Sequence, residues 1–284
     1  MTNHLDQVGE EREMSFIDHL EELRWHLIRA VIAIFIFSIA AFVAVDFVFN
    51  TVILGPAKPE FWTFRMLCKL GELMNSTAIC IEEIPFKIQS RQMTGQFTMH
   101  ITSSFVIGLI VAFPYVFWEF WRFISPGLHM NEKAVSRGAV FSVTLLFTLG
   151  ILFGYYIMAP LSVNFLANYQ VSELIYNEFD ITSYVGTIST LVLGSGILFQ
   201  LPIVVYFLSK IGVVTPDLMK IYRKHAIVVI LMLGAVLTPP DPLSQILIAF
   251  PLFGLYELSI LISRSVYRKQ RKKELLEQQK YKQS

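Results

Sequence analysis

Long apolar runs separated by polar and basic segments dominate this sequence. Four of the runs are long enough to cross a hydrocarbon core of roughly 30 Å as helices that rise 1.5 Å per residue. They are Leu27–Val45, Ile101–Trp118, Ala139–Leu161 and Tyr184–Leu208. Two shorter runs follow, Ala226–Leu237 and Leu243–Tyr256. Their position between cationic segments favours a tight transmembrane hairpin over a hairpin buried in a soluble core.

The pattern therefore predicts an all-α polytopic membrane protein with six transmembrane helices, of which the fifth and sixth are short. A helix over Ala226–Leu237 would be only about 18 Å long. Such a mismatch is relieved by thinning of the bilayer or by oligomerisation. Prolines inside four of the six segments predict kinked helices and a curved bundle. These prolines are Pro114, Pro160, Pro202 and Pro251.

Composition and charge support this prediction and orient the chain. Of the residues, 54% are hydrophobic and 16% are charged, whereas a soluble domain carries about 25% charged residues. All but five of the 23 lysines and arginines lie in the N-terminal segment, in the connections after the second and fourth runs, and in the tail. Because cytoplasmic loops of membrane proteins are enriched in these residues, we expect both termini in the cytoplasm and the protein in the bacterial inner membrane.

Four regions follow from this topology. Residues 1–26 are predicted to form a cytoplasmic amphipathic helix that leads into the first span, and residues 27–262 form the six-helix domain. Within it, residues 46–98 form a large periplasmic loop. Residues 263–284 form a basic cytoplasmic tail, either a charge-rich helix or a disordered end, that contacts anionic lipid. The polar N-terminal segment lacks the apolar core of a cleaved secretory signal.

The sequence offers little that could carry catalysis or hold a cofactor. Cys68 and Cys80 are too few for a disulfide scaffold and lack the spacing of a zinc site. In a periplasmic loop they could form a disulfide, or they could be a pair of buried thiols. We find no phosphate-binding glycine loop and no Ser/His/Asp set. Neither a metal, a cofactor nor a nucleic-acid partner is predicted.

Acidic residues gather at the predicted cytoplasmic boundary in two clusters. In the first, Ser15–Arg24, Glu22 is either a functional carboxylate or the partner of His26 in an ordinary helical pair, and Arg24 could pair with a preceding carboxylate in the same way. In the second, Trp118–Lys133, an aromatic belt ends in a Pro-Gly turn, and Glu132 either binds a ligand or pairs with a neighbouring cation.

Polar residues also interrupt the apolar segments. Gln200 lies within the fourth run, where an unpartnered amide costs several kcal/mol, so it is either a contact between helices or a functional group. Asp241 precedes a proline and could cap the sixth helix. Gln245 lies in the same outer turn. Glu257 interrupts the sixth apolar run, which Leu258–Ile262 extend.

Three motifs, in order along the chain, resemble those of the TatC family of twin-arginine protein translocases. The first is FIDHLEELR at Phe16–Arg24. The second is Phe113-Pro114 followed by WRFISPGL at Trp121–Leu128, and it ends on Glu132. The third is LTPPDPLSQ at Leu237–Gln245. The resemblance covers about residues 15–264.

The resemblance implies a non-enzymatic receptor and core channel subunit that binds twin-arginine signal peptides of folded cargo proteins at the cytoplasmic face. By motif position, Glu22 and Glu132 would bind the paired arginines. Arg24, His19 and Phe123 belong to the same motifs and are expected to line the site. A guanidinium favours a planar carboxylate because the two form bidentate hydrogen bonds.

The resemblance also implies partner subunits. Single-span subunits of the TatA/TatB type would be recruited for export driven by the proton-motive force, in a hetero-oligomeric complex that holds several copies of this chain. The residues expected at the partner interface are Thr238, Gln245, Gln200 and Asp241.

This sequence departs from the family pattern at three places. Gln200 stands where the family often has a glutamate, and His26 stands at a basic position, so that its charge depends on pH. The loop over residues 46–98 is longer than expected.

Two other classes of protein compete with this interpretation. A secondary transporter would have broken or charged helices at the bilayer midplane and internal repeats, and only Gln200 with its proline points that way. A membrane-bound enzyme would need a catalytic cluster, which we do not find in the sequence.

Overall fold

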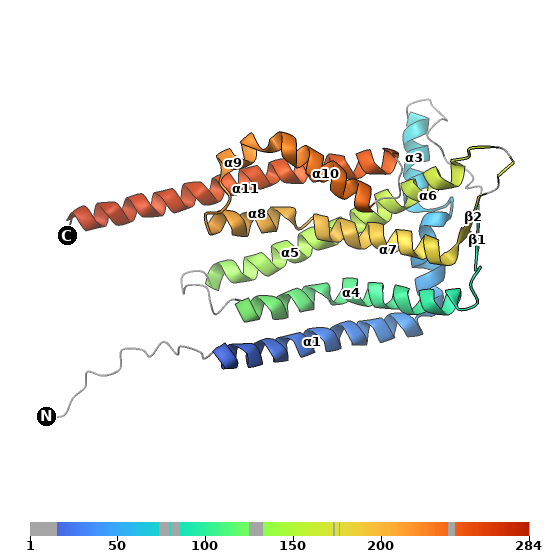
Figure 1. Cartoon of the computed structure of the whole chain (residues 1–284), viewed down its shortest axis with the longest axis horizontal. Coiled ribbons are helices and arrows are strands. Elements are labelled where there is room, and N and C mark those ends of the chain that lie inside the picture. Colours follow the sequence, from blue (N-terminus) through green and yellow to red (C-terminus); the bar gives the residue numbers. More distant parts are fainter. Residues whose placement is uncertain are drawn as a thin grey trace.

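The computed structural model describes residues 16–73, 80, 86–124, 133–172, 174–175, 177–237 and 242–283. Almost all of these residues are helical, and the long helices lie roughly side by side along one axis (Figure 1). The described ends of α1 and α11 lie at the same end of this axis, which we call the terminal end. Helix α3 and the strands β1 and β2 lie at the opposite, distal end.

Five segments of the described chain are long and apolar enough to cross a membrane. They comprise α1 (Phe16–Val43), α4 (Gly95–Ile124), the run of α5 (Lys133–Phe153), η5 (Gly154–Met158) and α6 (Ala159–Asn168), the pair α7 (Ile181–Leu198) and α8 (Leu201–Lys210), and α11 (Pro242–Gln283). The fifth predicted span corresponds to α10 (Arg223–Leu237), whose 15 residues make a helix about 22 Å long. The protein is therefore a mostly helical, multi-pass membrane protein.

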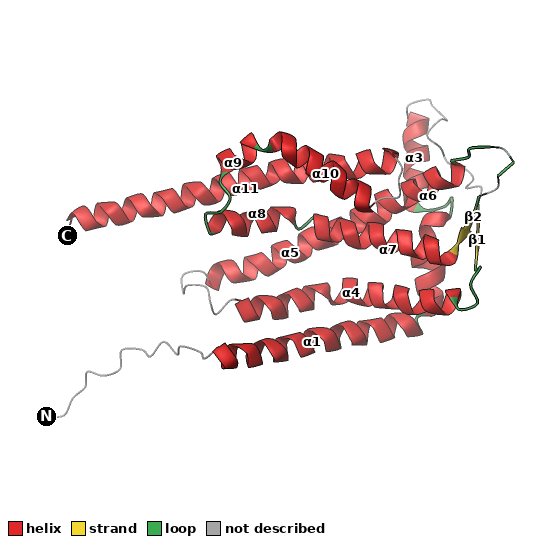
Figure 2. Cartoon of the chain, in the orientation of Figure 1, coloured by secondary structure: helices red, strands yellow, loops and turns green. Residues whose placement is uncertain are grey.

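Shorter elements connect the long helices, mainly at the distal end (Figure 2). They are α2 (Val45–Phe47), η1 (Val48–Ile53), η2 (Gly55–Ala57), α3 (Trp62–Leu73), β1 (Lys87–Gln89), β2 (Glu178–Asp180) and α9 (Pro216–Ile221). Most of them belong to the large loop predicted over residues 46–98, which is thus built largely from short helices.

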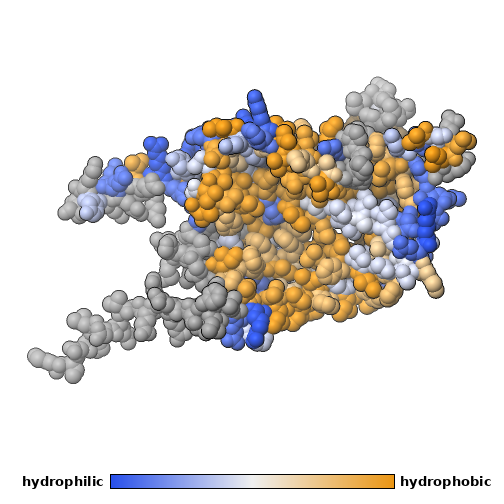
Figure 3. Space-filling model, viewed as in Figure 1, coloured by the Kyte–Doolittle hydropathy of each residue, from blue (hydrophilic) through white to orange (hydrophobic). Residues whose placement is uncertain are grey.

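The surface has the polarity of a membrane protein. Figure 3 shows hydrophobic residues over the middle of the molecule and hydrophilic residues gathered toward its two ends. Large apolar side chains on the outside of the long helices are exposed, among them Phe35, Ile36 and Met232. Exposed apolar surface of this extent marks contact with lipid or with other proteins.

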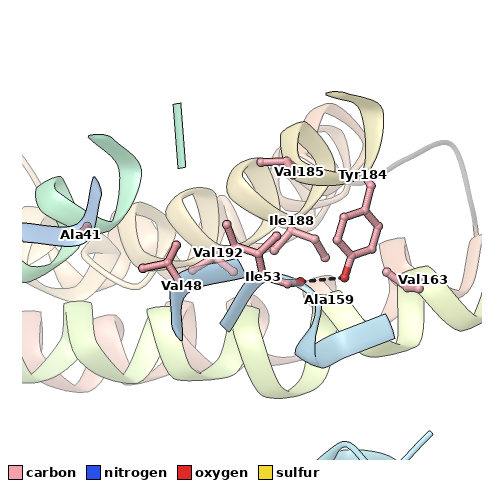
Figure 4. Packing of buried hydrophobic residues seen from close by; sticks show 9 residues of the cluster. All are labelled: Ala41, Val48, Ile53, Ala159, Val163, Tyr184, Val185, Ile188 and Val192. Atoms are coloured by element: carbon pink, nitrogen blue, oxygen red, sulfur yellow. Dashed lines mark hydrogen bonds between the residues drawn. The ribbon is translucent and has the colours of Figure 1, made fainter. Parts of the chain in front are cut away.

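One buried cluster joins the connecting elements to the long helices near the distal end. Val48 and Ile53 of η1 pack against Val185 and Ile188 of α7 (Figure 4). The Tyr184 hydroxyl donates a 2.8 Å hydrogen bond to the Ile53 carbonyl, drawn as the dashed line in Figure 4. This bond satisfies a carbonyl group that would otherwise be buried without a partner.

The four prolines act in two ways. Pro160 and Pro202 stand in the first turn of α6 and α8, where a missing N–H is tolerated. Pro160 follows the π-helical segment η5, and Pro202 follows the break between α7 and α8. Helices α4 and α11 continue through Pro114 and Pro251.

The prediction of a short sixth span is wrong. Helix α11 has 42 residues and continues through Glu257 and through the predicted boundary at residues 262–263 into the basic tail. Glutamate is itself a good helix former, and here Glu257 pairs with Arg223, at the start of α10, at 2.8 Å. The α11 helix is also tied to α8, since the Ser209 hydroxyl donates to the Ser263 hydroxyl at 2.8 Å.

A small parallel sheet departs from the purely helical prediction. Strands β1 and β2 pair over three residues each, with Ile88 beside Phe179. The Phe86 and Phe179 rings are 4.9 Å apart. Branched and aromatic side chains favour strands, and here they join two connections that lie about 90 residues apart in the chain.

Cys68 and Cys80 are joined by a disulfide. The sequence left a disulfide and two buried thiols open, and the structure decides for the disulfide. The bond closes a loop that begins in α3, with the two Cα atoms 4.2 Å apart.

Asp180 caps α7 and holds the two distal connections together. Its carboxylate accepts hydrogen bonds from the Thr182 hydroxyl at 2.6 Å, the Thr182 backbone N–H at 2.8 Å and the Arg91 backbone N–H at 3.0 Å. The hydroxyl bond, followed by the two backbone bonds, lowers the pKa of Asp180. Because the pKa of Asp180 is lower in the folded state, the ionised carboxylate stabilises the fold. This stabilisation is complete above the pKa of the unfolded state, about 3.9, and is lost as the pH falls through the pKa of the folded state.

We therefore expect Asp180→Ala to lower the melting temperature at pH 7, and to lower it by progressively less as the pH falls below about 3.9. Asp180→Asn should retain most of the stability at pH 7, because asparagine also caps helices well. Thermal unfolding of the purified protein in detergent measures both effects. Equal melting temperatures for wild type and Asp180→Ala at pH 7 would show that the cap does not stabilise the distal end.

Candidate functional site

The first and second motifs meet where α1 and α4 pack together at the terminal end. The two helices lie side by side (Figure 1), and Gly108 of α4 packs closely against Ser38 of α1. A Cβ atom on Gly108 would lie 2.6 Å from the Ser38 backbone nitrogen and 2.8 Å from its Cα atom. Only glycine permits this approach, which brings together side chains from two motifs far apart in sequence.

A buried hydrogen-bonded pair of a histidine and a glutamate lies at the terminal end of this helix pair. Oε2 of Glu119 in α4 is 2.5 Å from Nδ1 of His26 in α1. Glu119 is 1% exposed and His26 is 7% exposed. A carboxylate this deeply buried requires partners, because an isolated buried charge is strongly unfavourable.

Three more groups surround the Glu119 carboxylate. The Tyr115 hydroxyl donates a 3.0 Å hydrogen bond to Oε1. Nη1 of Arg29 lies 3.6 Å from Oε2, and Nη1 of Arg122 lies 3.9 Å from Oε1. Both guanidinium groups are about half exposed, so a single buried anion holds two cations at the surface beside the first motif.

Glu22 is the exposed carboxylate next to this pair. Its Oε1 atom lies 4.0 Å from Nε2 of His26, and its side chain is 38% exposed. The neighbouring Glu21 pairs instead with Arg24 at 3.5 Å, and both of these side chains are more than 60% exposed. Both helical pairs foreseen in the sequence are present. Glu22 nevertheless keeps an accessible carboxylate beside a fixed imidazole.

The other residues predicted for the signal-peptide site fall at different places. The Phe123 ring lies 6.3 Å from the His26 ring, so Phe123 belongs to this cluster. His19 lies in α1, about one turn before Glu22. Arg24 points to Glu21 and also lies 5.5 Å from the centre of the Trp25 ring. Glu132 lies outside the described residues.

Two of the four residues predicted for a partner interface have contacts within the chain. Nε2 of Gln200 donates to the Val143 carbonyl at 3.3 Å, which supports a role in helix packing, while Oε1 of the same amide is buried without a partner among the described residues. Nε2 of Gln245 donates to the Leu231 carbonyl at 3.2 Å and thus links α11 to α10. Thr238 and Asp241 lie outside the described residues.

Glu119 was not singled out from the sequence. It lies in an aromatic run at the end of an apolar segment, where a boundary charge is unremarkable. Its spacing to Tyr115 and Arg122 places all three on one face of a helix. That spacing is the only sign in the local sequence that Glu119 has partners. Its contact with His26 joins residues 93 positions apart and is visible only in the structure.

Comparison with known proteins now identifies the family. The family model described as Sec-independent protein translocase protein (TatC) matches residues 18–251. The chain belongs to the TatC family. The match includes the residues of the His26–Glu119 pair and most of the helical domain.

Relatives and solved structures agree with this assignment over nearly the whole chain. The Sec-independent protein translocase protein TatC of Blattabacterium sp. subsp. Periplaneta americana is 40% identical over 263 residues, which cover 92% of this chain and 99% of the relative. The TatC protein of Aquifex aeolicus is 32% identical over 259 residues, which cover 91% of this chain and 98% of the relative. The crystal structure of the twin arginine translocase receptor TatC aligns with a TM-score of 0.67 and 32% identity, over 88% of this chain and 99% of that one.

Membership of the TatC family decides between the classes of protein left open by the sequence. TatC proteins are subunits of the Sec-independent, twin-arginine protein translocase, which is a transport system. Membership of this family supports neither the interpretation as a secondary transporter nor the interpretation as a membrane-bound enzyme. This TatC-family protein is therefore a multi-pass membrane subunit in protein translocation.

Proposed function

We propose that this TatC-family protein is the receptor for twin-arginine signal peptides in its translocase, and that Glu22 binds one arginine of the pair. The observation that carries the proposal is the accessible Glu22 carboxylate, held in the first family motif beside a buried His26–Glu119 pair. The name of the aligned structure, twin arginine translocase receptor, points to the same role.

The chemistry of the site suits a guanidinium. A carboxylate with two accessible oxygens accepts two parallel hydrogen bonds from arginine, whereas the ammonium of lysine is a compact charge that lacks this fork. Glu119 pairs with the nearby Arg29 and Arg122, which reduces their repulsion of an incoming cation. By its place in the second motif, Glu132 would bind the other arginine.

Both termini are proposed to be cytoplasmic, with α10 as the short fifth of six spans in the inner membrane. An even number of spans agrees with the described ends of α1 and α11 lying at the same end of the molecule (Figure 1). The disulfide of Cys68 and Cys80 lies in the first connection, and disulfides form and persist in oxidising compartments such as the periplasm. The basic tail of α11 then lies on the cytoplasmic side, where anionic lipid attracts it.

Cysteine labelling in intact cells tests this orientation. After mild reduction, Cys68 and Cys80 should react with a maleimide that cannot cross the inner membrane, once the outer membrane has been made permeable. A cysteine placed at Gln279 in the tail should react only after the cells are lysed. Labelling of the tail cysteine in intact cells would contradict the proposed orientation.

Recruitment of single-span partner subunits is the second part of the proposed function, with export driven by the proton-motive force. Gln200 is proposed to join this contact, with its Oε1 atom, which is buried without a partner among the described residues, becoming accessible as the partner subunit docks. The adjacent Phe199 lines an apolar groove of about 530 Å³ together with Leu149, Leu152 and Phe153. Thr238, Asp241 and Gln245 are proposed to extend this interface at the outer turn. Photo-crosslinking from position 149 to a partner subunit tests the groove.

Export in cells tests the receptor function. A host whose own TatC is deleted receives this chain with the single-span subunits of the same organism and a folded reporter protein. We expect export of a reporter with an Arg-Arg signal peptide and little or none with a Lys-Lys signal peptide. Equal export of both reporters would overturn the assignment of the chain as a twin-arginine receptor.

A further inference from the structure

His26 lies between two carboxylates of different character. Its Nδ1 atom is 2.5 Å from Oε2 of Glu119, a side chain that is 2% exposed. Its Nε2 atom faces Oε1 of Glu22 at 4.0 Å, a side chain that is 38% exposed. The buried carboxylate therefore fixes the ring, and the second nitrogen of the ring points to the residue proposed to bind arginine.

The charged groups around the imidazole come from the two helices packed at this point. In α1 they are Glu22 and Arg29, and in α4 they are Glu119, Arg122 and the hydroxyl of Tyr115. Glu119 shares its negative charge among His26 and two guanidinium groups. Glu22 is therefore the carboxylate that faces the second ring nitrogen of His26.

The two protonation states of His26 present different faces to Glu22. A carboxylate only accepts hydrogen bonds, so a neutral imidazole keeps its proton on Nδ1 for Glu119 and turns a lone pair toward Glu22. Both oxygens of Glu22 are then free for a guanidinium. A protonated imidazole carries a second N–H on Nε2, and a movement of about 1 Å would bring it into a charge-assisted hydrogen bond with Glu22.

We propose that His26 is a positioning residue that makes signal-peptide binding at Glu22 dependent on protons. The imidazolium of His26 and the arginine of the peptide compete for the same carboxylate, so binding of the peptide releases a proton from His26. This inference rests on the proposed function of Glu22. By linkage, a complex that holds fewer protons than the free receptor becomes tighter as the pH rises.

Histidine is the side chain whose charge ordinarily changes between pH 5 and 8. An unperturbed imidazole has a pKa of about 6.5, whereas carboxylates ordinarily titrate at lower pH and arginine at much higher pH. If binding of one peptide releases at most one proton, the affinity for the peptide changes by at most tenfold per pH unit. We expect the dissociation constant of an Arg-Arg peptide to fall about three- to tenfold between pH 5.5 and pH 7.5.

Calorimetry with the full-length protein in nanodiscs tests the proposal. An Arg-Arg peptide that contains no His, Asp or Glu is titrated at several pH values and constant ionic strength, in pairs of buffers with different heats of ionisation. We expect binding of the peptide to release a fraction of one proton from the wild-type protein. This measurement needs no variant and so does not depend on how a substitution folds.

Two variants assign the proton to its residue. His26→Gln keeps a polar side chain that does not titrate, and its affinity for the peptide should be the same at pH 5.5 and pH 7.5. His19→Gln replaces the histidine about one turn before Glu22 in α1, and it should keep the pH dependence of the wild type even if its affinity is lower.

Three results would count against the proposal. If wild type prefers Arg-Arg over Lys-Lys peptides but binds with the same affinity across this pH range, His26 does not compete for Glu22. If His26→Gln retains the full pH dependence, the proton comes from another group. If no Arg-Arg selectivity appears at any pH, the proposed receptor function fails, and the role of His26 fails with it.

Discussion

Replacing Glu22 by glutamine is expected to reduce export of a twin-arginine reporter roughly 10- to 100-fold. Glutamine keeps the shape of the side chain and removes its charge. A hydrogen bond to a charged group contributes about 1.5–3 kcal/mol, and each 1.4 kcal/mol is a factor of ten in affinity. Export of the reporter in the host with deleted TatC measures the loss.

Glu21→Gln is the matched control. Glu21 is adjacent in sequence, but its side chain pairs with Arg24 on the exposed surface, where ion pairs contribute little. Export by Glu21→Gln should stay close to that of wild type, with equal amounts of both variants in the membrane. If the two variants lose export to the same extent, the general charge of the first motif is what matters and Glu22 has no special role.

Gly108→Ala is expected to lower the melting temperature of the protein substantially. The added methyl group would meet backbone atoms of Ser38 at 2.6 and 2.8 Å, and a backbone cannot move aside as a flexible side chain can. Overpacking of this kind costs about 1–3 kcal/mol. Separation of α1 from α4 should also pull His26 away from Glu119 and reduce export.

Gly254→Ala provides the comparison for this variant. Gly254 also lies within a long helix, and a Cβ atom there would meet no other atom within 4 Å. Alanine is favoured over glycine in a helix by roughly 0.5–1 kcal/mol, so this variant should melt at the same temperature as wild type or higher. Thermal unfolding in detergent compares the two variants. If Gly108→Ala were as stable as Gly254→Ala, the two helices would be shown to pack less closely at Ser38.

The apolar segments made most of the helical architecture predictable from the sequence. Each predicted run corresponds to a helix or to a pair of helices, because a run free of charge can satisfy its backbone in a membrane only by forming a helix. The length of α11 was not predictable in this way. Glu257 interrupts the apolar run in the sequence, and its pairing with Arg223, 34 residues earlier, is a contact that the local pattern does not contain.

The candidate site was predictable only in part. The first motif indicated Glu22, and the structure places this residue beside the second motif with its carboxylate accessible. Glu119 was missed because its importance depends on burial against α1, a property that the local pattern does not contain. The strands β1 and β2 were missed for a similar reason. Each has three residues, and their pairing depends on contacts between connections that are distant in the chain.

Direct binding of a signal peptide to the purified protein tests the central claim most directly. Wild-type protein in nanodiscs is titrated at pH 7.5 with two peptides that differ only in Arg-Arg or Lys-Lys, and the titration is repeated with Glu22→Gln. We predict that the Arg-Arg peptide binds at least tenfold more tightly than the Lys-Lys peptide and that Glu22→Gln removes this preference. Equal affinity of wild type for the two peptides, or a full preference in Glu22→Gln, would contradict the account.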